Sequence, residues 1–336
     1  MSRKKIAPDD ESLMAIDYNT NELFASLKPL EEHKNEPTQY MSYLPSFFTT
    51  ASLPFKNVNK TVFTRKGSQG VTLTLTSPTN VPFGKHGRLL LSILTTHAVL
   101  SKEKNVPVLI EYSSLSQLLK ELQLPKQRGK EIKEQLNCFK NATFCFEQKV
   151  ESLRSAYLFE ELNKKKPYPR EDIIVETVTS GTIPFTTAVQ FQNIPDQKNG
   201  SWVGEFKILL SAEFSAFCQQ HAVPINYSVY KEISSASGKD IYAWLVFRNN
   251  GLESDKPVFI PREKLVEQFM PIDDPNDRKT MSGYYGRIVD EIKEIKNKYY
   301  PELNVDLSDP TGIRLFKSPT PILKGETRYA LITSNI

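Results

Sequence analysis

Two stretches of this sequence, residues 85–148 and 238–316, predict the same order of secondary structure. Each begins with an apolar helix and continues with a short strand, a short helix, a longer helix that carries Lys and Arg, and a strand or hairpin. Apolar residues recur at three- and four-residue spacing in the helices and alternate in the strands. Because a repeated order of elements leaves few architectures open, we predict an α+β chain with two similar parts.

The predicted order is that of a winged helix-turn-helix, whose longer helix enters the major groove of DNA. We therefore expect two such domains in tandem, the first with a long insertion and the second followed by a tail. The expected boundaries are 1–59 for an N-terminal arm, 60–222 for the first domain, about 150–200 for its insertion, 223–320 for the second domain and 321–336 for the tail.

The N-terminal arm is polar and acidic, and prolines are scattered through it. This composition favours a flexible, mostly disordered segment. We expect one short helix in it, at 21–27, and ordered structure from about Lys60. The aromatic cluster from Tyr40 to Phe48 is unusual for a linker and is expected to dock on the body or on a partner.

A basic helix is expected at residues 126–141 of the first domain. Its apolar residues Ile132, Leu136 and Phe139 share one face, and the adjacent face is basic. A recognition helix needs this division, because it packs on its own domain and faces DNA at once. The alternative is a solvated flank that Glu131 and Glu134 neutralise. On the first interpretation, phosphate contacts come from Lys126, Arg128, Lys130 and Lys133.

The long helix expected at 275–299 in the second domain has a different composition. Small residues, Gly283 and Gly286, lie beside the cations Lys279 and Lys293 and roughly opposite an apolar stripe, with Arg287 at the edge of this face. Each glycine inside a helix costs about 1 kcal/mol relative to Ala, so two within one turn indicate close approach of a partner. We expect this helix to read bases and the following hairpin to contact the DNA backbone. The candidate residues are Arg278, Lys279, Ser282 and Arg287 in the helix, and Arg314 and Lys317 near the hairpin.

An earlier hairpin is expected from residues 62–64 and 71–76, whose Thr and apolar residues alternate. We expect its strand Val71–Thr76 near a sheet edge, where it pairs with its twin across a two-fold axis. The alternative is a hairpin that only covers its own core. The first interpretation predicts a monomer–dimer equilibrium, with the dimer surface on the first domain.

Charge and cysteine usage limit the partners. The net charge is only +4, but residues 61–150 hold 13 Lys and Arg against 6 Asp and Glu, which favours a local attraction for phosphate. The three cysteines and four histidines show no ligand spacing, so we expect neither metal nor cofactor. Apolar neighbours indicate buried thiols in a reducing compartment. The most apolar stretch, Leu89–Leu100, is too short for a membrane span, and the expected location is the cytoplasm.

Three segments of the chain resemble the iteron-plasmid replication initiator family, the plasmid-encoded RepA group. The first, Val81–Val99, is similar to the family's Pro-aromatic-Gly…Arg-Leu-Leu-Leu pattern. The second, Asp240–Arg248, reads Asp-Ile-Tyr-Ala-Trp-Leu-Val-Phe-Arg. The third joins Tyr300-Pro301 through strand, turn and strand to Ser318-Pro319. The three segments occur in the family's order over roughly residues 60–320.

The resemblance implies a protein that binds repeated sequences (iterons) in double-stranded DNA at a plasmid origin. It also implies opening of an AT-rich element and recruitment of the host initiator and replicative helicase. Monomers would load the origin, and dimers would repress the gene or pair origins. Within the motifs, Arg88 and Asp240-Ile241-Tyr242 start helices that pack, so we expect them to be structural and not to contact DNA.

Two other functions fit parts of the sequence. A dual winged-helix transcriptional regulator without a replication role would need the same two domains. A nicking initiator would need a tyrosine nucleophile, at Tyr284-Tyr285 or Tyr299-Tyr300, and a divalent metal usually held by a His-apolar-His pair. The sequence has no such pair and no P-loop. We therefore expect a DNA-binding protein that is not an enzyme.

Overall fold

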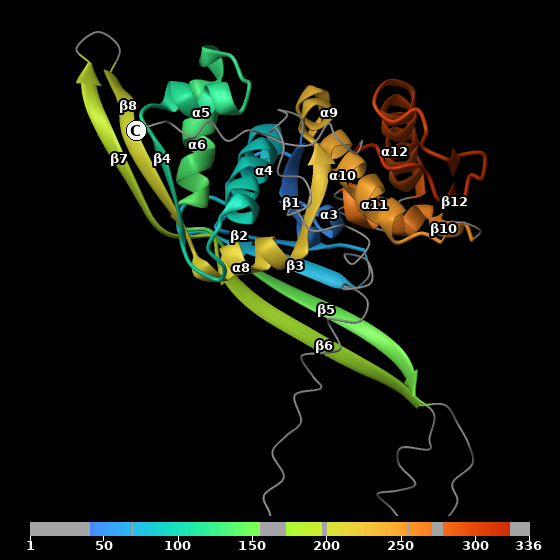
Figure 1. Ribbon diagram of the computed structural model, residues 1–336. Helices are drawn as coiled ribbons and strands as arrows, with labels where there is room; N and C mark the ends of the chain where they lie inside the picture. The colour runs from blue at the N-terminus through green and yellow to red at the C-terminus, as the bar shows by residue number, and fades with distance from the viewer. Residues whose placement is uncertain are drawn as a thin grey trace, which may run out of the picture.

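The computed structural model describes residues 41–68, 70–154, 173–196, 200–253, 256–270 and 278–322. Within these ranges, helices and strands form a mixed α+β arrangement (Figure 1). The expected helix at 21–27, parts of the expected insertion and most of the expected tail lie outside the described ranges. No helix in the described part is long and apolar enough to cross a bilayer.

The first unit, which we define as the described part of residues 62–221, contains the helices α4 (Gly84–Leu100), α5 (Leu115–Glu121) and α6 (Gly129–Phe139). Ser114 caps α5, because its side chain accepts from the backbone N–H of Gln117 at 3.3 Å. The sequence predicts one continuous helix from Lys126, but a 3₁₀ turn (Lys126–Arg128) precedes α6. Pro125 stands before that turn as its extended cap residue.

Two antiparallel sheets complete the first unit. Their strand orders are β2-β3-β5-β6 and β4-β8-β7, with bounds β2 Val62–Lys66, β3 Val71–Thr76, β4 Val108–Tyr112, β5 Thr143–Arg154, β6 Ile173–Pro184, β7 Thr186–Asp196 and β8 Gly200–Leu210. The β5–β6 and β7–β8 pairs are long hairpins that project from the body in opposite directions (Figure 1). The residues expected as an insertion thus extend the sheets. The helix α8 (Ala212–His221) follows β8.

The position of β3 differs from the expected sheet edge. β3 pairs with β2 on one side and with β5 on the other, so its backbone groups are engaged on both sides. Its apolar residues point into the core, and Leu73 is fully buried. The alternation at residues 71–76 therefore belongs to an interior strand, and β3 cannot pair with its twin in this sheet. The edge strands are β2 and β6.

The second unit, residues 236–322 where described, repeats the predicted order of elements. It runs α10 (Ala236–Asn250), β10 (Val258–Pro261), α11 (Arg262–Phe269), α12 (Arg278–Lys298), β11 (Val305–Asp306) and β12 (Gly312–Leu315). Its three strands form an antiparallel sheet of order β10-β12-β11. The helix α12 packs through Ile288, Ile292 and Ile295, each no more than 1% exposed, as their helical spacing predicts.

Helix and strand are already present in residues 41–50, which precede the expected start of ordered structure at Lys60. The strand β1 (Met41–Pro45) pairs with β9 (Ala222–Asn226), which lies between the two units and is followed by α9 (Tyr227–Glu232). The helix α3 (Ser46–Thr50) follows β1 directly, and its Phe47 ring lies 5.0 Å from Phe144 and 4.6 Å from Phe217. The aromatic cluster therefore docks on the body, because burial of its rings stabilises the fold.

An ion pair joins the first two resembling motifs across the junction of the units. Arg88 in α4 donates from Nε and Nη2 to the two carboxylate oxygens of Asp240 in α10, at 2.6 and 2.7 Å. The Arg88 and Asp240 side chains are only 2% and 6% exposed. Arg88 also donates to the backbone oxygens of Leu53, Pro54 and Gly84. The expectation that these motif residues are structural is confirmed, since loss of one partner would leave a buried, unpaired charge.

Candidate nucleic-acid interface

The basic face of α6 is present in the structure as the helical spacing predicts. Ile132, Leu136 and Phe139 are buried at 0–3% exposure, which turns the opposite side of the helix toward solvent. Lys130 is exposed there, and Lys133 is half-buried. Asn137 and Lys140 continue the same exposed face toward the end of the helix.

Arg128 differs from the lysines of this face, because it has a carboxylate partner. Its guanidinium lies 2.9 Å from Glu131 Oε1, and both side chains are more than a third exposed. A backbone hydrogen bond and the hydrogen bond from Arg128 lower the pKa of Glu131. Arg128 is therefore partly neutralised, whereas Lys126, which is exposed in the turn before α6, has no ion pair among the described residues.

On the outer face of α12, the helix backbone is accessible to solvent at two glycines. Gly283 and Gly286 are exposed, and no atom of the described structure lies within 4 Å of a Cβ built on either residue. Packing against the described residues therefore does not require a glycine at these two positions. The helix gives up about 1 kcal/mol at each of them relative to Ala. An external partner that approaches the backbone closely is a physical reason for that cost.

The structure divides the candidate residues of α12 between two flanks. Ser282 is exposed beside the glycines, but Arg287 lies about 140° further around the helix axis at 100° per residue. Arg287 lines a second hollow together with Asp290, Glu291 and Glu294, and its guanidinium lies 5.7 Å from the Tyr284 ring centroid. Arg278 and Lys279 begin α12, but their side chains are outside those described.

Lys293 belongs to the glycine face, although it was not among the predicted contacts. It is exposed and lies about 20° from Ser282 in helical projection. The spacing Ser282, Gly286, Val289 and Lys293 is a helical stripe that the sequence alone contains. The sequence therefore places Lys293 on this face, but the predicted contacts did not include it because they were restricted to the N-terminal half of the helix.

The acidic flank of α12 has a structural role. Glu291 Oε1 accepts hydrogen bonds from Ser235 Oγ at 2.7 Å and Ser237 Oγ at 3.1 Å. Ser235 is also the cap of α10, since its side chain accepts from the Gly238 backbone N–H. A carboxylate at a helix N-terminus is favoured by the helix dipole. This flank therefore anchors α10, and its negative charge disfavours approach of DNA from that side.

The two candidate residues near the C-terminal hairpin have partners within the protein. Arg314 lies 3.1 Å from Asp309 and 3.7 Å from Asp306, with its guanidinium 5.2 Å from the Phe259 ring centroid. Lys317 Nζ donates to the backbone oxygen of Asn249 at 2.8 Å, at the C-terminal end of α10. Both cations thus stabilise the second unit. Arg314 remains 43% exposed, but its charge is largely balanced.

Two of the four candidate tyrosine nucleophiles, Tyr285 and Tyr300, have hydrogen-bonded hydroxyl groups. Tyr285 donates to the backbone oxygens of Asp309 and Gly312, at 3.1 and 2.8 Å. Tyr300 is buried and donates to Pro319 O at 2.6 Å, and burial raises the pKa of its phenol to about 12. Raised pKa values disfavour the phenolate that a nucleophile needs. These two hydroxyl groups connect α12 and its C-terminal end to the following hairpin and loop.

Histidine and cysteine side chains occupy packing positions. His97 Nε2 lies 2.9 Å from Glu121 Oε1 and 3.3 Å from Tyr112 Oη, so this side chain is hydrogen-bonded within the first unit. Cys138 and Cys218 are buried, whereas Cys145 is only partly buried because it lies on the outer face of β5. Within the described ranges, no group of three or more His, Cys, Asp or Glu side chains is placed to hold a metal ion.

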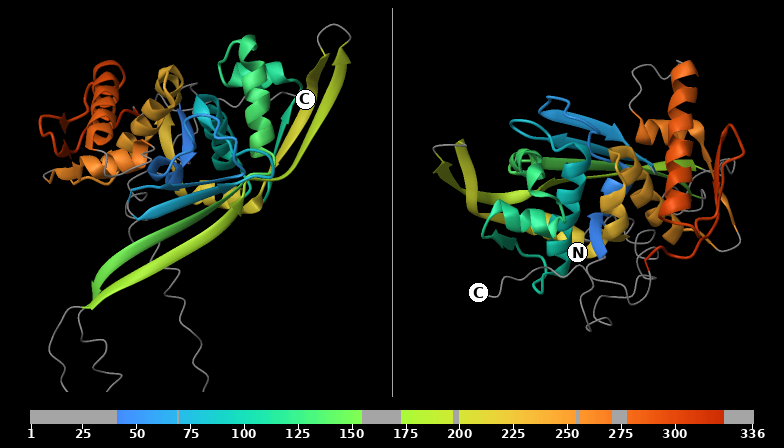
Figure 2. Two further views of the ribbon diagram at one scale, coloured as in Figure 1. Left: turned by 180° about the vertical axis from the view of Figure 1, so that it is seen from behind. Right: turned by 90° about the horizontal axis from the view of Figure 1, so that it is seen from above.

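The predicted residues form two separate groups and not one cluster. α6 and α12 lie at opposite ends of the body, with α4 and α10 between them (Figures 1 and 2). The first group is the basic face of α6 with the preceding turn. The second is the glycine face of α12, which we define as Ser282, Gly283, Gly286 and Lys293.

No protein-family model matches this chain, and no curated protein is similar to it in sequence. The solved structures that are similar to it include two of RctB domains. A crystal structure of domains 2 and 3 of RctB, as a selenomethionine derivative, has a TM-score of 0.46 at 9% identity and covers 81% of this chain and 96% of that chain. A second structure of RctB domains 2–3 has a TM-score of 0.40 at 8% identity, covering 80% and 94%. Similarity at this level does not establish a shared function.

Proposed function

We propose that this chain is a plasmid replication initiator that binds iterons in duplex DNA through two tandem winged-helix domains. It acts in the cytoplasm without metal, cofactor or enzymatic activity. The proposal extends the resemblance of the three sequence motifs to the iteron-plasmid initiators. The order α10, β10, α11, α12, β11, β12 and the sheet order β10-β12-β11 support a winged helix for the second unit.

The observation that carries the proposal is the glycine face of α12. A surface helix normally covers its exposed side with long polar side chains, but here the backbone is accessible at Gly283 and Gly286. The floor of the DNA major groove suits such a face, because close approach brings Ser282 and Lys293 to base edges and phosphates. Arg278 and Lys279, in the first turn of the same helix, are proposed to read bases with them.

The first unit supplies phosphate contacts in this proposal. The exposed side of α6 is basic and contains no glycine after Gly129 at its start, so it attracts the DNA backbone without close approach. Lys126, Lys130 and Lys133 are proposed to contribute most, and Arg128 less because of its pairing with Glu131. Arg287, Arg314 and Lys317 are proposed as weak, peripheral contacts because each has a role inside the second unit.

Assembly and partners are also part of the proposal. Dimers would repress the gene for this protein, and monomers would load the origin and bring in the host initiator and helicase. Since β3 is an interior strand, a dimer formed through this sheet would use the edge strand β2 or β6. Val62 on β2 and Val178 on β6 are both 51% exposed, which leaves apolar surface for such a contact.

DNase footprinting of the purified chain on DNA flanking its own gene tests the proposal. We expect protection of several repeats at regular spacing, together with permanganate reactivity in a neighbouring AT-rich segment. Protection of the promoter without permanganate reactivity would indicate a transcriptional regulator instead. Absence of any sequence-dependent protection would refute both functions.

A further inference from the structure

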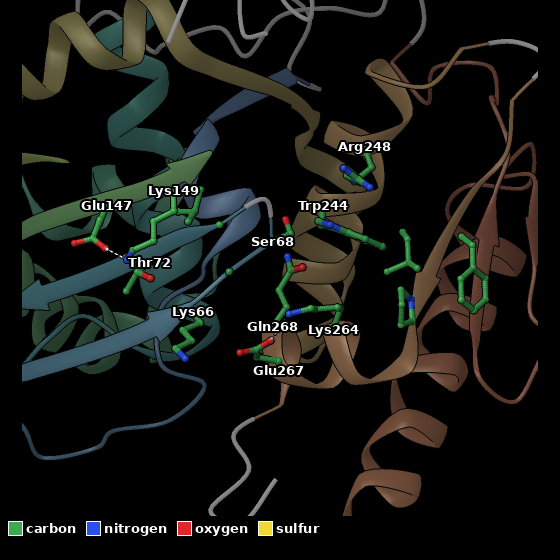
Figure 3. Close-up of a pocket in the computed structure, with 16 residues that line it drawn as sticks. Lys66, Ser68, Thr72, Glu147, Lys149, Trp244, Arg248, Lys264, Glu267 and Gln268 are labelled. Atoms are coloured by element: carbon green, nitrogen blue, oxygen red, sulfur yellow. Dashed lines mark hydrogen bonds and ion pairs between the residues drawn. The ribbon is translucent and has the colours of Figure 1, made fainter. Parts of the chain in front are cut away.

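A cavity of about 680 Å³ lies between the two units. One wall comes from β5 and from the turn between β2 and β3, which carries Lys66 and Ser68. The opposite wall comes from α10, β10 and α11 and carries Trp244, Arg248 and Gln268 (Figure 3). The volume lies within the range of about 300–1,000 Å³ that small-molecule sites occupy.

Four buried polar atoms in these walls have no hydrogen-bond partner among the described residues. They are Ser68 Oγ, Trp244 Nε1, Arg248 Nε and Gln268 Nε2. Trp244 is 1% exposed and Gln268 is 5% exposed. An unpaired buried donor costs about 1–3 kcal/mol, so most such groups in folded proteins are paired. The concentration of four around one cavity is therefore unusual.

The hydrogen-bonding capacity of these four atoms indicates which kind of ligand the cavity can bind. The three nitrogen atoms can only donate hydrogen bonds, and the serine hydroxyl can also donate. Ser68 is held in place because its backbone N–H donates to Thr50 O at 3.2 Å. A ligand that satisfies the site must therefore present several acceptor oxygens to both walls.

The charge of the lining favours a negative ligand. Lys264 is paired with Glu267, and Lys149 lies 3.9 Å from Glu147. Lys66 and Arg248 line the same cavity and have no carboxylate partner among the described residues. Burial lowers the pKa of Arg248.

We propose that this cavity binds a phosphate group, whose oxygens accept from Trp244 and Gln268 on one wall and pair with Arg248 and, across the cavity, Lys66. A guanidinium with neighbouring N–H donors is a common phosphate-binding arrangement. Because the two walls belong to different units, bound phosphate would hold the units in one relative orientation. The site is distinct from the basic face of α6 and the glycine face of α12.

Two sources share this chemistry: a free phosphate compound, such as a nucleotide, and a backbone phosphate of DNA. Position favours the free compound, because the lining residues face one another between the two units, whereas duplex phosphates usually meet side chains on an open surface. The cavity volume also exceeds what a single phosphate group fills, which leaves room for the rest of such a compound.

Fluorescence of Trp244 provides a direct test. The chain has two tryptophans, so Trp202→Phe leaves Trp244 as the only indole. In that background we would titrate the full chain with inorganic phosphate, pyrophosphate, ATP and a short duplex DNA, with chloride at matched ionic strength as the reference. We expect a saturable change with at least one phosphate compound and none with chloride.

Variants on both walls then locate the binding. Gln268→Leu should weaken binding at least tenfold, which is the scale of one lost hydrogen bond to a charged group. Lys66→Gln on the opposite wall should weaken it several-fold, and it remains informative if Gln268→Leu does not fold, because Lys66 is exposed. Arg262→Gln is the matched control, since Arg262 is a cation of α11 that pairs with Glu263 and does not line the cavity.

The outcomes distinguish between the two sources of phosphate and show whether the cavity binds phosphate. A response to free phosphate compounds that depends on Gln268 or Lys66 supports the site. A response to duplex DNA alone, with the same dependence, supports the site with DNA as the source of the phosphate. No saturable change with any probe, or equal affinity in all variants, would overturn the inference. The titrations with free phosphate compounds contain no DNA, so a negative footprint does not affect them.

Discussion

The two helices that carry the predicted DNA contacts, α6 and α12, arrange charge and bulk in different ways. On α6, lysines follow one another along a single exposed side. On α12, the exposed side is split between a glycine face and an acidic flank that is bonded to the start of α10. The first pattern attracts any polyanion, whereas the second admits only a surface of suitable shape and from one direction. A basic helix alone would therefore be a poor guide to the helix that we propose reads bases.

The largest expected effect is on the free energy of unfolding, when the ion pair that joins the two units is broken. Asp240→Asn should lower the free energy of unfolding by about 3–5 kcal/mol, because Arg88 would be left buried without its carboxylate. Urea unfolding followed by circular dichroism measures this loss. Asp290→Asn, at an exposed position of α12, is the control and should change little. Two separate transitions in the wild-type protein would show that the units unfold independently.

The pH dependence of stability tests the same junction in a second way. Burial, with the charges of Arg88 and Lys85, lowers the pKa of Lys239 from 10.5 to about 7, although Asp240 acts in the opposite direction. Between these values the unfolded chain holds a proton that the folded chain has lost, so stability should rise with pH across this window. We expect a rise on the order of a few kcal/mol between pH 7 and about 10.

Urea unfolding at several pH values, for wild type and Lys239→Met, measures this rise. Lys239→Met should remove it, because the titrating group is gone. The Nζ of Lys239 donates to the backbone oxygens of Tyr230 and Lys231, so the variant will also show a loss that is independent of pH. An equal slope in both proteins would mean that another group titrates.

Gly286→Leu tests the glycine face directly. The open space around Gly286 accommodates the side chain, and replacing glycine within a helix should leave the free protein as stable or slightly more stable. Affinity for the specific DNA site should nevertheless fall at least tenfold, which mobility-shift titration measures. Asn297→Leu, on the same side of α12 three turns further on, is the control. Unchanged affinity would refute α12 as the base-reading helix.

The smallest expected effect is the one on α6. Lys130→Gln with Lys133→Gln should reduce the slope of log affinity against log salt concentration by roughly two units, equally for specific and non-specific DNA. Lys298→Gln on α12 is the control, because that lysine pairs with Glu294 at 2.7 Å. A slope that does not change would mean that the basic face of α6 is only solvated.

The order of elements in both units was predictable from the sequence, because helical and strand periodicity are local properties. The position of β3 was not, since residues 71–76 alternate identically whether the strand is central or at an edge. Its second neighbour is β5, which begins at Thr143 and is distant in sequence. Likewise, the prolines before Lys60 favoured a flexible arm. The side chains of Phe47 and Phe48 are nevertheless buried, so this part of the expected arm packs on the body.

The sequence indicated the surroundings of some candidate side chains and not of others, and the difference has physical causes. The basic face of α6 follows from periodicity alone and is present in the structure. Arg287, which the sequence placed at the edge of the face with Ser282, lies about 140° from Ser282 around the helix and lines a separate hollow. Arg314 and Lys317 looked like free cations in the sequence, but Asp309 and the end of α10 are brought to them by the tertiary fold. No sequence pattern indicates the cavity between the units.

The pairing of β1 with β9 also has a consequence for how the chain is made. Met41 lies opposite Asn226, so 185 residues separate the two strands along the sequence. At a synthesis rate of about 5–20 residues per second, β1 leaves the ribosome roughly 10–40 s before its partner. During that interval, Met41, Tyr43 and Phe47 have no β9 to cover them. The nascent chain therefore exposes an apolar strand early in its synthesis, which makes this segment a natural point of attachment for molecular chaperones.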